Sequence, residues 1–149
     1  MKKIKVLGLF IMLMVLSAGC GKKTLTCTQE TDENGMATKQ EIKMVFKSDK
    51  VTSVKMDMGF SITNDQMKEY WPTMVESLEN GFAIEETKGV KVETKKDDKN
   101  YKLNYIVEID LKKASKDELT KIGLDDVADE SSSYTKTKEE AEKDGYTCK

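Results

Sequence analysis

The sequence predicts an α+β domain in which an antiparallel sheet of about five strands carries a long helix on one face. Two observations predict this fold. Three segments with alternating apolar and polar residues precede a segment whose apolar residues recur every three or four positions, and two more alternating segments follow it. The expected order is β-β-β-α-β-β-α-α, and residues 20–149 have the length of a single domain.

The first three strands are expected to form a meander. Leu25 and Cys27 alternate with threonines in a short first strand, and residues 32–35 supply polar turn residues. Apolar residues then occupy every second position over 42–46 and again over 54–62. This period of two gives the sheet one apolar face, and we expect its opposite face to be mostly polar.

The helical segment is expected to start near a cap at Thr63 or Asn64 and to end at Gly81. Pro72 lies within it, where a missing backbone donor predicts a kink in one bent helix. The apolar stripe consists of Met67, Tyr70, Trp71, Met74, Val75 and Leu78.

A second hairpin should follow, with strands over 90–92 and 101–111 joined by a turn at 97–100. A short helix is expected after Ser115, ending at Gly123. Residues 125–135 are interpreted as a loop, and a last short helix is expected between a cap at Thr137 and Asp144.

Residues 1–19 have the features of a secretory signal. Lys2, Lys3 and Lys5 precede an apolar run from Val6 to Leu16, which is shorter than the roughly 20 residues that span a bilayer. The sequence Leu-Ser-Ala-Gly-Cys over residues 16–20 then resembles the lipobox of bacterial lipoproteins. The resemblance implies that Cys20 becomes the lipid-modified N-terminus of a protein held on the exported face of a cell membrane. The alternative is ordinary cleavage near Gly19, which would release a soluble secreted protein.

Composition excludes several classes of function. The chain has 25 basic and 27 acidic residues, and the lysines of the signal segment leave the rest more acidic, which argues against nucleic acid as a partner. It has neither arginine nor histidine. Bidentate guanidinium recognition, Ser-His-Asp and Cys-His catalysis, and imidazole metal sites are therefore excluded.

Two cysteines remain after Cys20. In an exported protein, Cys27 and Cys148 are expected to form a disulfide that joins the first strand to the end of the chain. The alternatives are free thiols or metal ligands, although two lone sulfurs make a poor metal site. We expect no bound metal and no cofactor.

The chain resembles the YehR-like bacterial lipoproteins. The resemblance rests on Cys20 with residues 21–23 behind it, the segment 46–51 within the meander, residues 89–91, and the closing segment 145–149. None of these is a catalytic motif. The resemblance implies an exported α+β lipoprotein without an assigned activity.

Three groups of residues could carry chemistry. Asp125, Asp126, Asp129 and Glu130 could bind calcium, but their spacing is more typical of a solvated loop. The methionines could bind copper(I), but their positions on core faces favour packing. Four aromatic residues could line an apolar groove or could belong to the core: Tyr70, Trp71, Tyr101 and Tyr105.

These features predict a non-enzymatic binding or interaction module at the cell envelope. Its partner would be an envelope protein or a small apolar ligand, besides the membrane that holds the lipid. The alternative is a small envelope enzyme that works with carboxylates, as glycosidases do with a pair set 5 to 10 Å apart. No such pair stands out from the acidic residues of the sequence.

Overall fold

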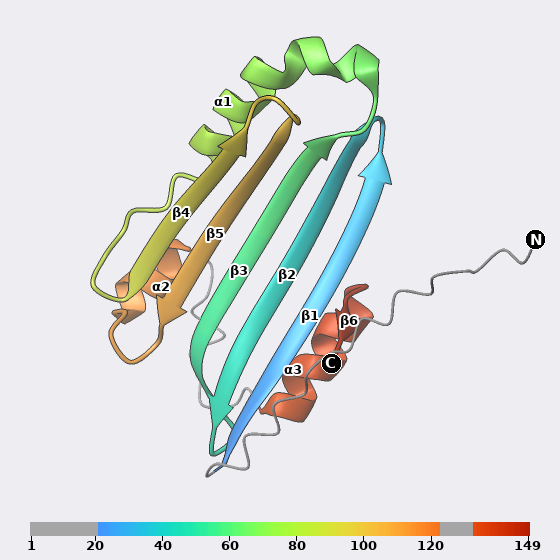
Figure 1. The fold of residues 1–149 in the computed structure, drawn as a ribbon. Coiled ribbons are helices and arrows are strands. Elements are labelled where there is room, and N and C mark those ends of the chain that lie inside the picture. Colours follow the sequence, from blue (N-terminus) through green and yellow to red (C-terminus); the bar gives the residue numbers. More distant parts are fainter. Residues whose placement is uncertain (1–20, 123–132) are drawn as a thin grey trace, which may run out of the picture.

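A computed structural model describes residues 21–122 and 133–149. They form one six-stranded antiparallel sheet with strand order β4-β5-β3-β2-β1-β6. Figure 1 views the sheet from its uncovered face, with helices behind it. The strands are β1 (Lys22–Glu33), β2 (Met36–Lys47), β3 (Lys50–Ile62), β4 (Val90–Asp97), β5 (Lys102–Asp110) and β6 (Thr147–Cys148).

The predicted meander is confirmed, and tight turns set its register. Asn34 and Gly35 both have positive φ between β1 and β2, as do Ser48 and Asp49 between β2 and β3. Turns of this kind match the right-handed twist of paired strands. The resulting pairs place Leu25 opposite Met44 and, one strand further, Met44 opposite Val54.

The core lies on one face of the sheet because side chains alternate along each strand. Two clusters fill it. One contains Leu25, Phe46 and Val107 with Leu119, and the other packs Trp71 and Val75 against Phe60, Ile62 and Leu103. Within 21–122 and 133–149, no helix covers the opposite face, and its side chains are mainly polar. These observations confirm an α+β fold with helices on one face.

The predicted bent helix is instead two elements. A 3-10 helix, η1 (Asp65–Tyr70), leads into the α-helix α1 (Trp71–Gly81). Pro72 occupies the first turn of α1 and therefore does not interrupt a helix, so the predicted kink is wrong. Proline is favoured there because the first backbone N–H groups of a helix have no intrahelical acceptor. Asn64 caps η1, where its side chain accepts a hydrogen bond from the backbone N–H of Gln66.

Two short helices follow the second hairpin. The helix α2 (Lys116–Lys121) starts at Ser115, which forms a capping box with Glu118. The helix α3 (Tyr134–Lys143) is capped by Ser133, so it begins before the expected cap at Thr137. The Ser133 side chain accepts a hydrogen bond from the N–H of Lys136, which is the chemistry expected of an N-cap.

The sixth strand corrects the predicted count of five. Thr147 and Cys148 form β6, which pairs with the middle of β1 so that Cys148 lies opposite Cys27. The disulfide between these cysteines is confirmed, with their Cα atoms 4.1 Å apart. Backbone hydrogen bonds between Thr26 and Lys149 in both directions extend the pairing. The end of the chain therefore covers part of an otherwise open sheet edge.

Candidate functional site

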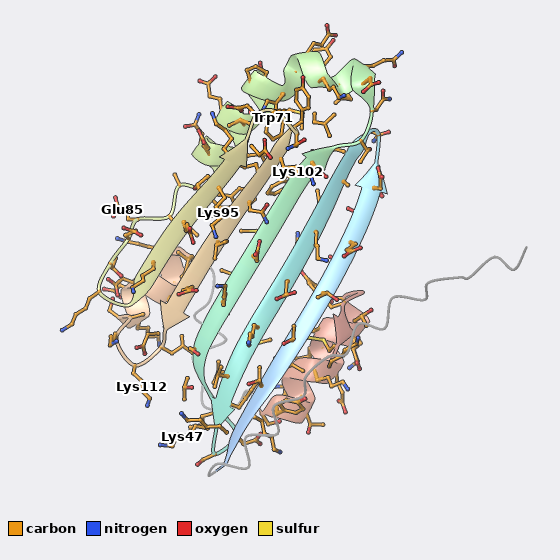
Figure 2. All side chains as sticks on the ribbon, in the orientation of Figure 1. Lys47, Trp71, Glu85, Lys95, Lys102 and Lys112 are labelled. Carbon is orange, nitrogen blue, oxygen red and sulfur yellow. A yellow bond between two sulfur atoms is a disulfide. The ribbon has the colours of Figure 1, made fainter. Side chains whose placement is uncertain are left out.

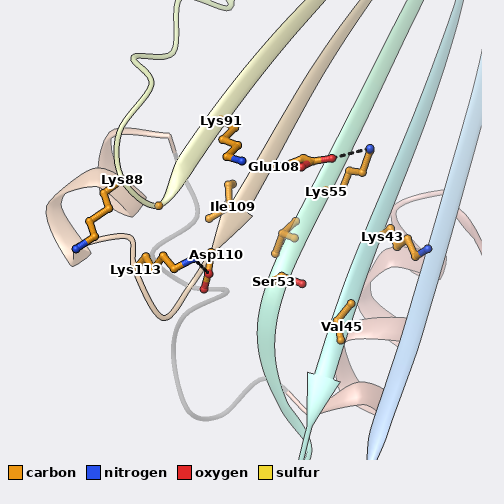
Figure 3. A pocket seen from close by; sticks show the side chains of 12 residues that line it. Lys43, Val45, Ser53, Lys55, Lys88, Lys91, Glu108, Ile109, Asp110 and Lys113 are labelled. Carbon is orange, nitrogen blue, oxygen red and sulfur yellow. Dashed lines mark hydrogen bonds and ion pairs between the residues drawn. The ribbon is translucent and has the colours of Figure 1, made fainter. Parts of the chain in front are cut away.

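The uncovered face of the sheet holds a shallow hollow that crosses β2, β3, β5 and the start of β4. Its volume is about 410 Å³. Figure 3 shows lysine side chains around it, contributed by strands and by the segments that flank β4 and β5. The lining residues are Lys43, Val45, Ser53, Val54, Lys55, Lys88, Gly89, Lys91, Glu108, Ile109, Asp110 and Lys113.

Alternation places the charges of this hollow on the uncovered face. Lys43 of β2, Lys55 of β3 and Glu108 of β5 follow one another across the sheet, since Lys43 pairs with Lys55 and Lys55 with Glu108. Lys91 of β4 pairs with Glu108 and completes the row. One row across four strands therefore carries three lysines and one glutamate.

Two of the five lining lysines are neutralised by the two lining acids. Lys55 Nζ lies 2.7 Å from Glu108 Oε1, and Lys113 Nζ lies 2.9 Å from Asp110 Oδ2. The hydrogen bond from Lys55 lowers the pKa of Glu108 and raises the pKa of Lys55, and the charge of each group adds to the effect. All these groups are exposed, so the pairs contribute little to stability.

The other three lining lysines are available to a ligand. Lys43, Lys88 and Lys91 form no ion pair with any residue in 21–122 or 133–149. Each ammonium group has three hydrogen-bond donors and no acceptor. A hollow with an excess of three positive charges and an apolar patch from the half-buried Val45 suits an anionic group attached to a small organic body.

Gly89 shapes the hollow where β4 begins. A Cβ at this position would come within 2.2 Å of the backbone nitrogen of Ala114, so only glycine fits. The Gly89 carbonyl accepts a hydrogen bond from the N–H of Asp110 over 2.8 Å. The close approach of these two segments brings Lys88 and Lys113 to the same rim.

A second hollow lies beside Tyr70, on the side of α1. It has a volume of about 430 Å³ and an almost wholly apolar lining. Tyr70 is 54% exposed, the largest such value for a large hydrophobic side chain in the described part of the chain. The lining consists of Met36, Met67, Tyr70, Thr73, Met74, Ser77 and Leu78.

The four aromatic residues of the predicted groove do not lie together on one surface. Trp71 is 4% exposed and packs edge to face on Tyr101, with ring centroids 6.1 Å apart. Tyr105 is buried in the other cluster, beside Phe82 at 5.5 Å between centroids. Of these four, only Tyr70 lines the apolar hollow, and three of the other six lining residues are methionines.

Some predicted sites fall outside the described residues. Cys20 and the acidic residues of 125–130 belong to this group, so the structure places neither the lipid attachment site nor the proposed calcium ligands. Within 21–122 and 133–149, no three His, Cys, Asp or Glu side chains are grouped so that they could hold a metal ion. No helix in these ranges is long and apolar enough to cross a membrane.

Sequence reasoning missed the lysine-lined hollow. Its lysines come from four separate segments, and each one considered alone is an ordinary polar residue of an alternating strand or turn. The signal that could have found it is the strand register, because Lys43, Lys55 and Lys91 align only once the pairing of β2, β3, β5 and β4 is known.

No protein-family model and no curated protein sequence matches the chain. Two solved structures are similar to it. One is the NMR structure of a protein from Streptococcus pneumoniae TIGR4, with 17% identity, a TM-score of 0.57, and coverage of 86% of this chain and 85% of that one. The other is the NMR structure of the Escherichia coli YehR protein, with 23% identity, a TM-score of 0.49, and coverage of 86% and 92%. The likeness to the pneumococcal protein shows a shared fold.

Proposed function

We propose that this chain is a membrane-anchored lipoprotein of the YehR-like kind whose domain is a non-enzymatic binding module. Its ligand is a small molecule or peptide group that carries phosphate or carboxylate, bound in the lysine-lined hollow. The observation that carries the proposal is the group formed by Lys43, Lys88 and Lys91, three lysines without ion-pair partners in the described chain around one concave surface.

The composition of the hollow supports binding in preference to catalysis. Its titratable groups are exposed lysines and two carboxylates already engaged by lysines. A protonated lysine offers three hydrogen-bond donors and no acceptor, so it is a cation and not a general base. The hollow therefore offers positive charge and hydrogen-bond donors, which is what recognition of an anion requires.

The anchor part of the proposal rests on residues 1–20. It is supported by the lipobox-like segment that ends at Cys20 and by the start of β1 at Lys22, directly beyond it. Two acyl chains on Cys20 would give stable attachment, because each buried methylene contributes about 0.8 kcal/mol. The intact mass of the protein from its native membrane fraction tests this part. A chain that begins at Cys20 without a diacylglyceryl adduct would contradict it.

The ligand part can be tested with inorganic phosphate as the probe. Titration followed by amide chemical shifts should move the resonances of Lys43, Lys91 and Ser53 together, with a dissociation constant in the millimolar range. The double variant Lys43→Gln/Lys91→Gln should abolish these shifts. The matched control, Lys99→Gln/Lys102→Gln, removes two exposed lysines that lie outside the hollow and should leave them unchanged. Equal weakening by both variants would refute a specific site.

The hollow beside Tyr70 supports a second candidate function, the binding of a small apolar ligand. Its support is the exposure of Tyr70 together with a lining of methionine and leucine side chains, which adapt to varied apolar shapes. A neutral fluorescent dye such as Nile red should bind there. Met74→Lys should abolish the fluorescence gain, whereas Lys43→Gln/Lys91→Gln should preserve it.

A further inference from the structure

Lysines gather at one end of the sheet, the end at which β1 begins. The register pairs Lys22 of β1 with Lys47 of β2, and Lys47 with Lys50 of β3. Lys23 follows Lys22, and its ammonium group lies 5.5 Å from the ring centroid of Tyr134. Lys112, which follows β5, lies toward the same end of the sheet (Figure 2).

Two acids near this end make hydrogen bonds or ion pairs of their own. Asp49 Oδ1 accepts a hydrogen bond from the backbone N–H of Tyr134 over 3.0 Å. Asp110 forms an ion pair with Lys113 and also accepts a hydrogen bond from the N–H of Lys112. Lys22, Lys47 and Lys112 are exposed and form no ion pair with any residue that the structure describes.

The opposite end of the same strands mixes acids with lysines. β1 ends there with Asp32 and Glu33, and around the turn between β4 and β5 Asp97 and Asp98 are flanked by Lys96, Lys99 and Lys102. The chain as a whole carries a formal net charge of −2, so it has no general attraction for anionic surfaces. Any such attraction must come from a local concentration of lysines.

The position of Cys20 relative to these lysines points to the occupant. Gly21 and Lys22 directly follow Cys20 in the chain, and Lys22 lies beside Lys47. A lipid on Cys20 would therefore bring this end of the sheet, and not the opposite end, to the bilayer surface. Exposed lysines within about a Debye length of anionic headgroups are attracted to them.

We infer that the end of the sheet formed by Lys22, Lys47 and Lys112 docks on the anionic phospholipid surface of the membrane and holds the strands upright on it. In that orientation the lysine-lined hollow opens sideways, close to the bilayer, and α1 with Tyr70 lies at the far end. The orientation rests on the proposed lipid anchor, whereas the affinity of the lysine end for anionic lipid does not.

The experiment uses the chain from Gly21 to Lys149, which carries no lipid. All described core contacts and the disulfide fall within these residues, so the fragment keeps the fold. It should sediment with vesicles of phosphatidylglycerol and phosphatidylcholine but not with vesicles of phosphatidylcholine alone. Binding should disappear at about 1 M salt, where the Debye length is about 3 Å.

Matched double variants locate the surface. Lys22→Gln/Lys47→Gln should weaken partitioning about 25-fold, because each lysine near an anionic surface contributes about fivefold. Lys22→Arg/Lys47→Arg should bind as the parent does. Lys99→Gln/Lys102→Gln, which removes two lysines from the opposite end, should also bind as the parent does. Circular dichroism spectra should be the same for all these chains.

The inference would be overturned by vesicle binding that does not depend on phosphatidylglycerol. It would also be overturned if the two glutamine variants lost the same amount of vesicle affinity. Failure of the anchor has a different signature, since it changes the mass at Cys20 and leaves vesicle binding of the unlipidated chain intact. Failure of the ligand site would be seen in a different experiment, as the absence of phosphate-induced amide shifts at Lys43 and Lys91.

Discussion

The indole Nε1 of Trp71 donates a 2.9 Å hydrogen bond to Oδ1 of Asp98. This contact joins the first turn of α1 to the turn between β4 and β5, two segments that are separate in the sequence. Trp71 is buried, whereas the carboxylate of Asp98 is exposed. The hydrogen bond from Trp71 is the main reason why the pKa of Asp98 lies below its ordinary value.

A depressed pKa predicts how this contact responds to acid. Its stabilisation is complete above the unfolded-state pKa of Asp98, about 3.9, and is lost as the pH falls through the lower folded-state value. Denaturant unfolding, followed through the fluorescence of the single tryptophan, should therefore show stability falling below about pH 4. Asp98→Asn should make this fall shallower, because the amide keeps an acceptor oxygen but does not titrate.

A double-mutant cycle with Trp71→Phe serves as the control. Phenylalanine removes the donor, so Asp98→Asn in that background should change the acid dependence no further, with unfolding followed by circular dichroism. Equal effects of Asp98→Asn in both backgrounds would show that Asp98 acts through other neighbours, such as Lys96 at 3.4 Å.

Reduction of the disulfide should destabilise the fold strongly. The bridge connects positions 121 residues apart, and removing a native disulfide from a small domain costs about 2 to 5 kcal/mol. Urea unfolding of Cys27→Ser/Cys148→Ser should show a fall of that size in the free energy of unfolding. Alkylation of the two cysteines only after reduction, detected by mass, would confirm the bond in solution. Two thiols that react without a reductant would contradict it.

Gly89→Ala should destabilise the domain by about 1 to 3 kcal/mol, because the added Cβ collides with the backbone of Ala114. The same change should weaken phosphate binding by separating Lys88 from Lys113. Gly81→Ala is the matched control. No atom lies within 4 Å of a Cβ there, so this substitution in the last residue of α1 should be neutral or slightly stabilising in thermal unfolding.

The hydroxyl of Tyr105 holds the segment between α1 and β4. It donates a hydrogen bond to the carbonyl of Phe82 and accepts one from the N–H of Ile84 over 3.3 Å. Tyr105→Phe should lower the free energy of unfolding by about 1 to 3 kcal/mol. Tyr70→Phe removes an exposed hydroxyl and should change stability by less than about 0.5 kcal/mol. Equal stabilities of the two variants in urea unfolding would contradict this role.

Local patterns predicted most of the secondary structure. Apolar residues at every second position over 42–46 and 54–62 predicted the central strands, and Ser115 marked the start of α2. The start of the α-helix is at Trp71 and not near Asn64 as predicted. The apolar stripe continues through the 3-10 helix η1, so only the position of Pro72 in the first turn of α1 marks the boundary between the two helices.

The sequence by itself determined the properties that depend on residue type and short spacing. These include the α+β class, the apolar face of the sheet and the expectation that Cys27 pairs with Cys148, which the structure confirms. Tertiary structure alone decided which distant side chains meet. The strand register aligns Lys43 with Lys55 and places Lys22 beside Lys47. The disulfide holds β6 against the edge strand β1. Strand register depends on contacts throughout the core between residues that are distant in the sequence. For that reason the candidate sites could not be predicted from local pattern.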